Sequence, residues 1–148
     1  MPFCVLSFGT NVAAQGLAEG LQVADPGKIR VLIEDLPSGA QRLGLSQQQV
    51  GARVSSNLRK AGIKPVDEAI TPEIVLYVQI SVVENTVCVD VAVMRPVTFQ
   101  VGDSVMSTLA TTWRKGVSGR ANTADYILQA VDRQVDVFCN EFLKANHK

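Results

Sequence analysis

The sequence predicts an α+β protein in which two helices cover one face of a single four-stranded, mainly antiparallel sheet. Four segments alternate apolar and polar residues with the period of a strand, and two segments repeat apolar residues with the period of a helix. Their order is strand, helix, three strands, helix, and we expect the three consecutive strands to form an antiparallel meander. Each helix has one apolar stripe to bury, so both are expected on the same side of the sheet.

The chain of 148 residues has the length of one domain. The turn-forming cluster ADPG at 24–27 is the one boundary in its composition. We therefore expect a single α+β domain over 28–148, preceded by an N-terminal arm over 1–27 that is not a separate domain.

The first strand is expected at 28–36 and is ended by Pro37. The helix at 47–61 has the clearest local signals in the chain. Ser46 and Gln49 have the spacing of a capping box, and Gly62 stands where a left-handed residue commonly ends a helix. Leu58 belongs to its apolar stripe, and Pro65 prevents the helix from continuing.

The next two strands are expected at 73–83 and from 86 to 93 or beyond, joined by a tight turn at Glu84 and Asn85, because Asn tolerates positive φ. Pro96 indicates an edge position or a bulge. The Gly-Asp pair at 102–103 predicts a hairpin into a fourth strand at 104–114, followed by a loop at 115–122. The last helix is expected at 123–145, with its buried stripe formed by Ile127, Val131, Val135, Phe138 and Phe142.

Composition excludes several kinds of site. The only histidine is His147, and Cys4, Cys88 and Cys139 are widely spaced, so neither a zinc site nor a histidine-based catalytic triad is expected. We expect Cys88 and Cys139 to be free cysteines that are buried as small hydrophobic residues. We expect no cofactor and no enzymatic activity.

Two groups of acidic residues have structural explanations. Glu34 and Asp35 are adjacent in a strand, so they point to opposite faces and do not form an acid–base pair. Asp132, Asp136 and Asn140 have the spacing of a divalent-cation site, but this spacing is also that of the polar face of an amphipathic helix.

The N-terminal residues leave two interpretations open. An apolar stretch at 2–8 precedes VAA at 12–14, which has the small residues that signal peptidase favours, but no Lys or Arg precedes the stretch. The segment is either a structural arm in a cytoplasmic protein or a degraded or truncated signal of an exported one. No apolar run is long enough to cross a bilayer.

One cluster suggests contact with nucleic acid or another anion. Trp113 has an aromatic face on which a base can stack, and Arg114, Lys115 and Arg120 can meet phosphates. The 14 basic residues are balanced by 14 acidic ones, so the general charge signature of a nucleic-acid-binding protein is missing. The alternative is that Trp113 closes the end of the core while the cations are solvated.

The sheet face opposite the helices is the main candidate for a functional surface. The alternation places on it an apolar cluster of Leu32, Val75, Tyr77, Met94 and Met106. Apolar clusters of this kind often mark interfaces, so we expect a homodimer formed through this face. In a competing interpretation the N-terminal arm covers the face or adds a strand. In a third interpretation the protein is an enzyme with an unrecognised active site in a cleft between the arm and the sheet.

Four short motifs carry a resemblance to known proteins: RVLIEDL at 30–36, GLS at 44–46, LRKAGI at 58–63 and LYVQI at 76–80. They resemble small bacterial proteins, often exported, that share this core. The order of strands and helices is similar to that of the N-terminal domain of the Tol translocation protein TolB and of anticodon-binding-like folds. The resemblance covers about residues 28–146 and implies a fold and an envelope setting, but no catalytic residues.

Overall fold

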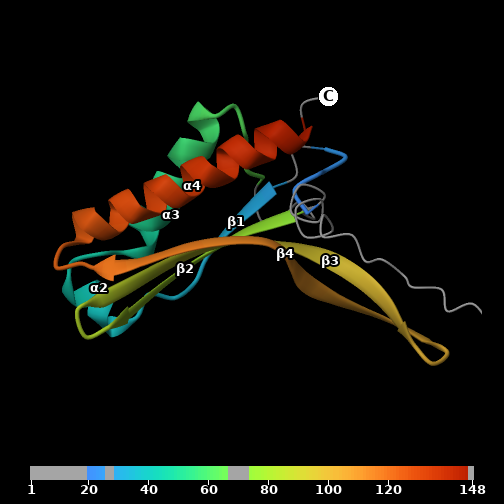
Figure 1. The fold of residues 1–148 in the computed structure, drawn as a ribbon, viewed down its shortest axis with the longest axis horizontal. Coiled ribbons are helices and arrows are strands. Elements are labelled where there is room, and N and C mark those ends of the chain that lie inside the picture. Colours follow the sequence, from blue (N-terminus) through green and yellow to red (C-terminus); the bar gives the residue numbers. More distant parts are fainter. Residues whose placement is uncertain (1–19, 26–28, 67–73, 147–148) are drawn as a thin grey trace, which may run out of the picture.

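The computed structural model describes residues 20–25, 29–66 and 74–146 (Figure 1). Its elements in chain order are β1 (Ile29–Ile33), α2 (Ser38–Arg42), α3 (Gln47–Lys60), β2 (Ile74–Val83), β3 (Thr86–Val101), β4 (Ser104–Arg120) and α4 (Ala124–Asn146). The predicted arm up to residue 19, with Cys4, and the C-terminal His147 lie outside the described residues.

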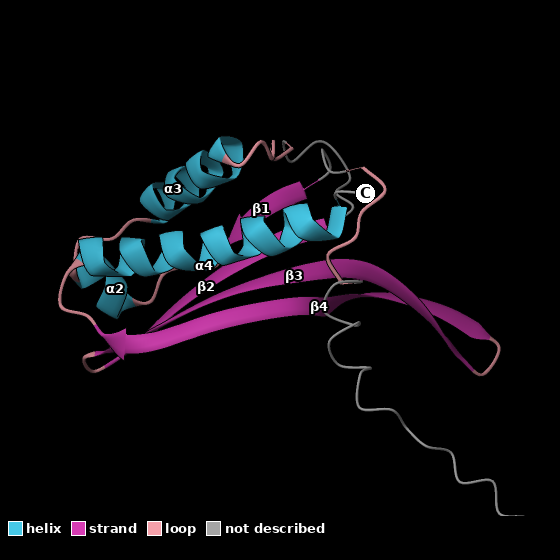
Figure 2. Cartoon of the chain, turned by 45° about the horizontal axis from the view of Figure 1, so that its top comes forward, coloured by secondary structure: helices cyan, strands magenta, loops and turns pink. Residues whose placement is uncertain are grey.

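The four strands form one sheet in the order β1-β2-β3-β4. β1 and β2 are parallel, whereas β2, β3 and β4 form the expected antiparallel meander. Figures 1 and 2 show α3 and α4 together on one face of this sheet. The predicted two-layer α+β fold, with both long helices on the same side, is therefore confirmed.

Helix α3 follows its sequence signals closely. The Ser46 hydroxyl accepts a hydrogen bond from the Gln49 backbone N–H at 3.1 Å, and the Gln49 side chain accepts one from the Ser46 N–H at 2.9 Å. Gly62 has a φ of 80°, and the Ile63 N–H donates to the Leu58 carbonyl at 2.9 Å, which closes the C-terminus.

The core lies between the helices and the sheet. The five predicted stripe residues of α4 are buried, together with Val50, Val54 and Leu58 of α3. Trp113 lies beside Phe138 with ring centroids 5.6 Å apart, in an edge-to-face arrangement. Leu21 also belongs to the core, so the described part of the expected arm contributes to the domain's packing.

Residues 20–23 are held near the C-terminus of α4. The Asn146 side chain donates to the Leu21 carbonyl and accepts from the Val23 N–H, both at 2.9 Å. Arg95 donates to the Gln22 carbonyl, and the Thr112 hydroxyl lies 3.0 Å from the Gly20 carbonyl. These bonds tie the segment to α4, β3 and β4.

The structure adds one helix to the predicted elements and corrects two details. The stretch after Pro37, for which no element was predicted, contains the short helix α2, whose Ala40 is fully buried. The predicted tight turn at Glu84 and Asn85 is confirmed, but its residue with positive φ is Glu84, at 56°, rather than Asn85. Residues 115–120 belong to β4 rather than to a loop, because Gly116 and Gly119 continue the pairing with β3.

Gly116 has a packing role inside the strand. It pairs with Asp90, and a Cβ atom at this position would collide with the Asp90 carboxylate. The missing side chain leaves room for that carboxylate, which forms an ion pair with Arg114 at 3.1 Å. A glycine that indicates a turn in the sequence is therefore a site of close approach in the sheet.

The antiparallel hairpin continues well beyond the rest of the sheet. Pairing between β2 and β3 ends at Met94, whereas β3 and β4 stay paired to the turn at 102–103. We call this two-stranded part, Arg95–Val101 of β3 with Ser104–Ala110 of β4, the ribbon. Figure 1 shows it projecting past the helices. Pro96 lies in it, beyond the reach of β2, so its predicted edge position is confirmed.

Candidate functional site

The open face is the side of the sheet that α3 and α4 do not cover, and its apolar part lies on β1, β2 and β3. The register places Leu32 beside Tyr77 and Tyr77 beside Ala92, while Val75 pairs with Met94. Leu32 is 48% exposed, and Tyr77 and Met94 are half-buried. Four of the five residues predicted for the interface, Leu32, Val75, Tyr77 and Met94, therefore lie together.

Val75 occupies the floor of this cluster rather than its surface. It is only 7% exposed, as is Ala92 on the neighbouring strand. The accessible contact area on the open face therefore comes from Leu32, Tyr77 and Met94.

The Tyr77 hydroxyl has a polar partner. Its pKa is raised, first because burial disfavours the phenolate, and further because of a hydrogen bond with Glu34 and the charge of that carboxylate. The hydroxyl is thus satisfied within the chain, while the ring borders Leu32 and Ala92.

Met106, the fifth predicted residue, does not belong to the open face. The register between β3 and β4 shifts at Val93 and Met94, where Thr112 is the extra residue of a bulge. Beyond the bulge Met106 pairs with Phe99, which is five positions from Met94 and therefore on the opposite face of β3. Uninterrupted alternation along β4 had predicted the wrong side.

The ribbon is a second exposed apolar surface. Among the described residues, ten large hydrophobic side chains are exposed, and half of them lie here: Phe99, Val101, Val105, Met106 and Leu109. They occupy both faces of the ribbon, so no single face is protected by packing on the core. The sequence signal for this surface is a stretch from 96 to 109 with Asp103 as its one charged residue.

The polar half of the open face carries the Asp90–Arg114 ion pair. Next to it is a shallow hollow lined by Cys88, Asp90, Gly116, Val117 and Ser118. Within the described parts of the chain, no group of three His, Cys, Asp or Glu side chains has the geometry to hold a metal ion. The hollow is open to solvent.

The structure separates the four residues of the predicted anion-binding cluster. Trp113 is 1% exposed, and its Nε1 donates to Glu141 Oε2 at 2.6 Å. Lys115 lies on the same side, 3.6 Å from Glu141, whereas Arg114 points to the other face and pairs with Asp90. Arg120 is exposed at the far end of β4. Because successive residues of a strand point to opposite faces, the cluster residues do not lie together. The structure supports the alternative in which Trp113 belongs to the core.

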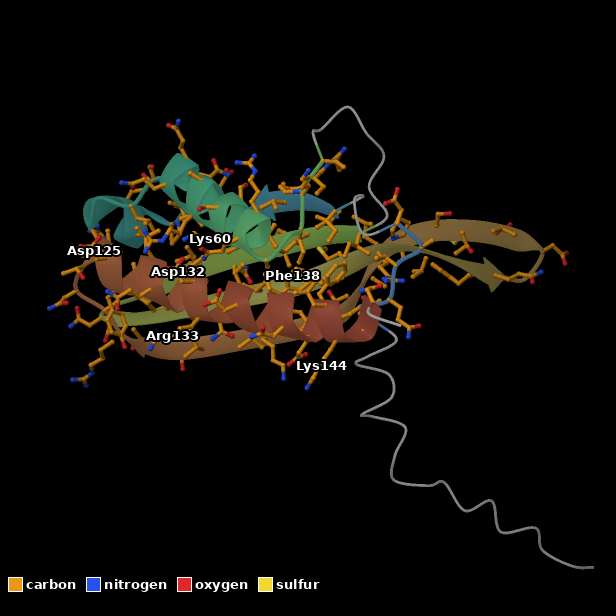
Figure 3. The ribbon with its side chains drawn as sticks, turned by 90° about the horizontal axis from the view of Figure 1, so that it is seen from above. Lys60, Asp125, Asp132, Arg133, Phe138 and Lys144 are labelled. Atoms are coloured by element: carbon orange, nitrogen blue, oxygen red, sulfur yellow. The ribbon has the colours of Figure 1, made fainter. Side chains whose placement is uncertain are left out.

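The acidic residues of α4 are also divided. Asp132 faces α3, where it pairs with Arg53 at 2.8 Å and accepts from Asn57 at 2.7 Å. Figure 3 shows Asp132 between the two helices. Burial alone would raise the pKa of Asp132, but the hydrogen bonds from Arg53 and Asn57, with the charges of Arg53 and Lys60, lower it below its ordinary value. Asp132 is therefore part of the contact between helices, while Asp136 and Asn140 are exposed.

Cys139 is buried, and Cys88 is half-buried beside the hollow; both are free thiols. Burial, with the nearby charge of Asp136, raises the pKa of Cys139 to about 11. A thiol in this state is a poor nucleophile at neutral pH.

No protein-family model matches the chain, and no curated protein is similar enough to count as a relative. The helices of the described residues include none that is long and apolar enough to span a membrane.

Proposed function

We propose that this protein is a non-enzymatic interaction module that associates with itself through the open face. The observation that carries the proposal is the pairing of Leu32, 48% exposed, with the half-buried Tyr77 on the face that α3 and α4 leave uncovered. Water disfavours such a cluster, and its burial against another surface would be stabilising.

A second copy is a suitable partner for this face. An interface around a two-fold axis needs a patch that is complementary to itself, and an apolar cluster meets this condition without matching charges. Glu34 is the hydrogen-bond partner of Tyr77. On the polar half of the face, Asp90 and Arg114 already neutralise each other within one chain. Like-charge repulsion from this pair therefore does not oppose the approach of a second copy.

The solution mass tests the proposal, measured by analytical ultracentrifugation at tens of micromolar. We expect a dimer or a larger assembly, and Tyr77→Glu should release folded subunits because it places a charge in the contact. Tyr126→Glu is the matched control, because Tyr126 is 43% exposed on α4, on the other side of the molecule. Its mass should equal that of the unchanged protein.

Two outcomes would contradict the proposal. A monomeric mass for the unchanged protein excludes self-association. If the protein is monomeric and Tyr77→Glu lowers its stability, the face is covered within the same chain, as the alternative with the N-terminal arm requires.

A further inference from the structure

Among the described residues, the ribbon has two edges without a strand partner. β4 is the last strand of the sheet, and no described strand pairs with its outer side. β3 loses its partner β2 after Met94, and no other described strand pairs with its outer side from Arg95 onward. Each edge therefore offers backbone N–H and C=O groups to another strand.

The edge of β3 is blunted by a proline. Pro96 pairs with Leu109 and has no N–H to donate, so the two residues form a non-hydrogen-bonded pair of the ladder. In such a pair the backbone groups of both residues point away from each other. The outer edge of β3 consequently lacks a donor at Pro96, which is a common way of protecting an exposed edge.

The edge of β4 has no such protection. From Ser104 to Thr112 it contains neither a proline nor a charged residue. Hydrogen-bonded and non-hydrogen-bonded pairs alternate along an antiparallel ladder, so Val105, Ser107 and Leu109 all direct their backbone groups outward. Three consecutive outward positions form a template for a further strand.

We propose that β4 of a second copy binds this edge in antiparallel orientation, with the two-fold axis between the two Ser107 residues. The proposal rests on the proposed self-association, but it uses a contact separate from the open face. It predicts that Val105 pairs with Leu109 of the second copy, and Leu109 with its Val105. Met106 then lies opposite Thr108 of the second copy, on the other face.

This register favours a second copy over an unrelated strand. It brings Val105, 74% exposed, beside Leu109, 52% exposed, and the two-fold axis produces this apolar pair twice. No like charges meet, because the paired segment is uncharged. Contact over so few residues lies near or below the lower limit of specific interfaces, about 1,200 Å², so we expect it to be weak without the open face.

Disulfide trapping suits a weak contact of known register. Ser107→Cys is placed in a chain with Cys4→Ser and Cys88→Ser, in which the buried Cys139 remains. Opposite residues of a hydrogen-bonded antiparallel pair have Cα atoms about 5.5 Å apart, within the range that a disulfide spans. We expect oxidation to produce a covalent dimer of Ser107→Cys.

The matched control is Thr98→Cys, because Thr98 is the partner of Ser107 within the ribbon and is also exposed, but lies on the blunted strand. It should cross-link much more slowly. Mixing Val105→Cys chains with Leu109→Cys chains tests the register, since the mixed dimer should form faster than either self-pair.

A third comparison separates this proposal from the open-face proposal. If both contacts form, Tyr77→Glu leaves cross-linking through Ser107→Cys in place, and Ser107→Lys leaves the open-face dimer in place. If Ser107→Cys cross-links no faster than Thr98→Cys at about 100 µM protein, the ribbon contact is excluded, whatever the solution mass shows. If the dimer is sensitive to Ser107→Lys but not to Tyr77→Glu, the ribbon contact is supported and the open-face contact is excluded.

Discussion

Trp113 is the only tryptophan of the chain, and its replacement tests the assignment of this residue to the core. Trp113→Phe removes the hydrogen bond from the indole N–H to Glu141, which has a donor–acceptor distance of 2.6 Å. A hydrogen bond to a charged group contributes about 1.5–3 kcal/mol. The low end applies, because the Glu141 side chain is 37% exposed and keeps water and Lys115 as partners. The smaller ring also leaves a cavity that costs about 1 kcal/mol. We therefore expect a loss of about 2–3 kcal/mol in the free energy of unfolding.

Urea unfolding followed by circular dichroism measures this loss without depending on tryptophan fluorescence. Glu141→Gln is the companion variant, because its amide oxygen still accepts the indole hydrogen bond; it should cost less than about 1 kcal/mol. In the unchanged protein, tryptophan emission should be that of a buried indole and should not change when single-stranded RNA is added. A loss of less than about 1 kcal/mol in the free energy of unfolding for Trp113→Phe would refute the assignment of Trp113 to the core. Quenching of the tryptophan emission by RNA would also refute it, because it would show that the indole is exposed.

The remaining predictions concern the helices and the thiol. Ser46→Ala should lower the free energy of unfolding by about 1 kcal/mol in a chemical denaturation, because the α3 cap is lost. Leu58→Ala should lower it by about 2–5 kcal/mol, and a smaller loss would contradict the full burial of this side chain. Because folding lowers the pKa of Asp132, this carboxylate stabilises the fold at pH values above its ordinary pKa of 3.8, and the stabilisation is lost as the pH falls through the pKa of the folded state. Asp132→Asn should therefore reduce the dependence of stability on acid pH. Cys139, with a pKa of about 11, should stay unmodified by a thiol reagent at pH 8 until urea unfolds the chain, and rapid labelling of the native protein at this site would contradict its burial.

The elements predicted well from the sequence are those whose signals are local. The start of α3 depends on Ser46 and Gln49, which are three residues apart, and its end depends on Gly62 and Pro65. Interactions between residues so close in the sequence can be recognised from the sequence alone. The predicted bounds of α3 therefore differ from the observed ones by only one residue, at the C-terminus. The same holds for the apolar stripe of α4.

The errors come from partners that are distant in the sequence. Gly116 indicates a loop when β4 is considered alone. In the sheet, its missing side chain leaves room for the carboxylate of Asp90 on the neighbouring strand β3. The side on which Met106 lies depends on a bulge near Thr112, and alternation within one strand does not reveal an extra residue. Candidate interface residues on one side of the bulge were therefore grouped correctly, while Met106 beyond it was not.

The exposure of the ribbon follows from the lengths of the elements. With a rise of about 1.5 Å per residue, the 23 residues of α4 span about 35 Å. With a rise of about 3.3 Å, the 16 residues of β3 span about 53 Å. A helix layer of this length leaves a substantial part of β3 and its partner β4 without cover, as Figure 2 shows. The uncovered part carries Phe99, Val105 and Leu109 rather than the lysines and glutamates that usually protect a free edge. Apolar residues at positions that the helices do not reach are the reason for assigning the ribbon a role in association rather than in the core.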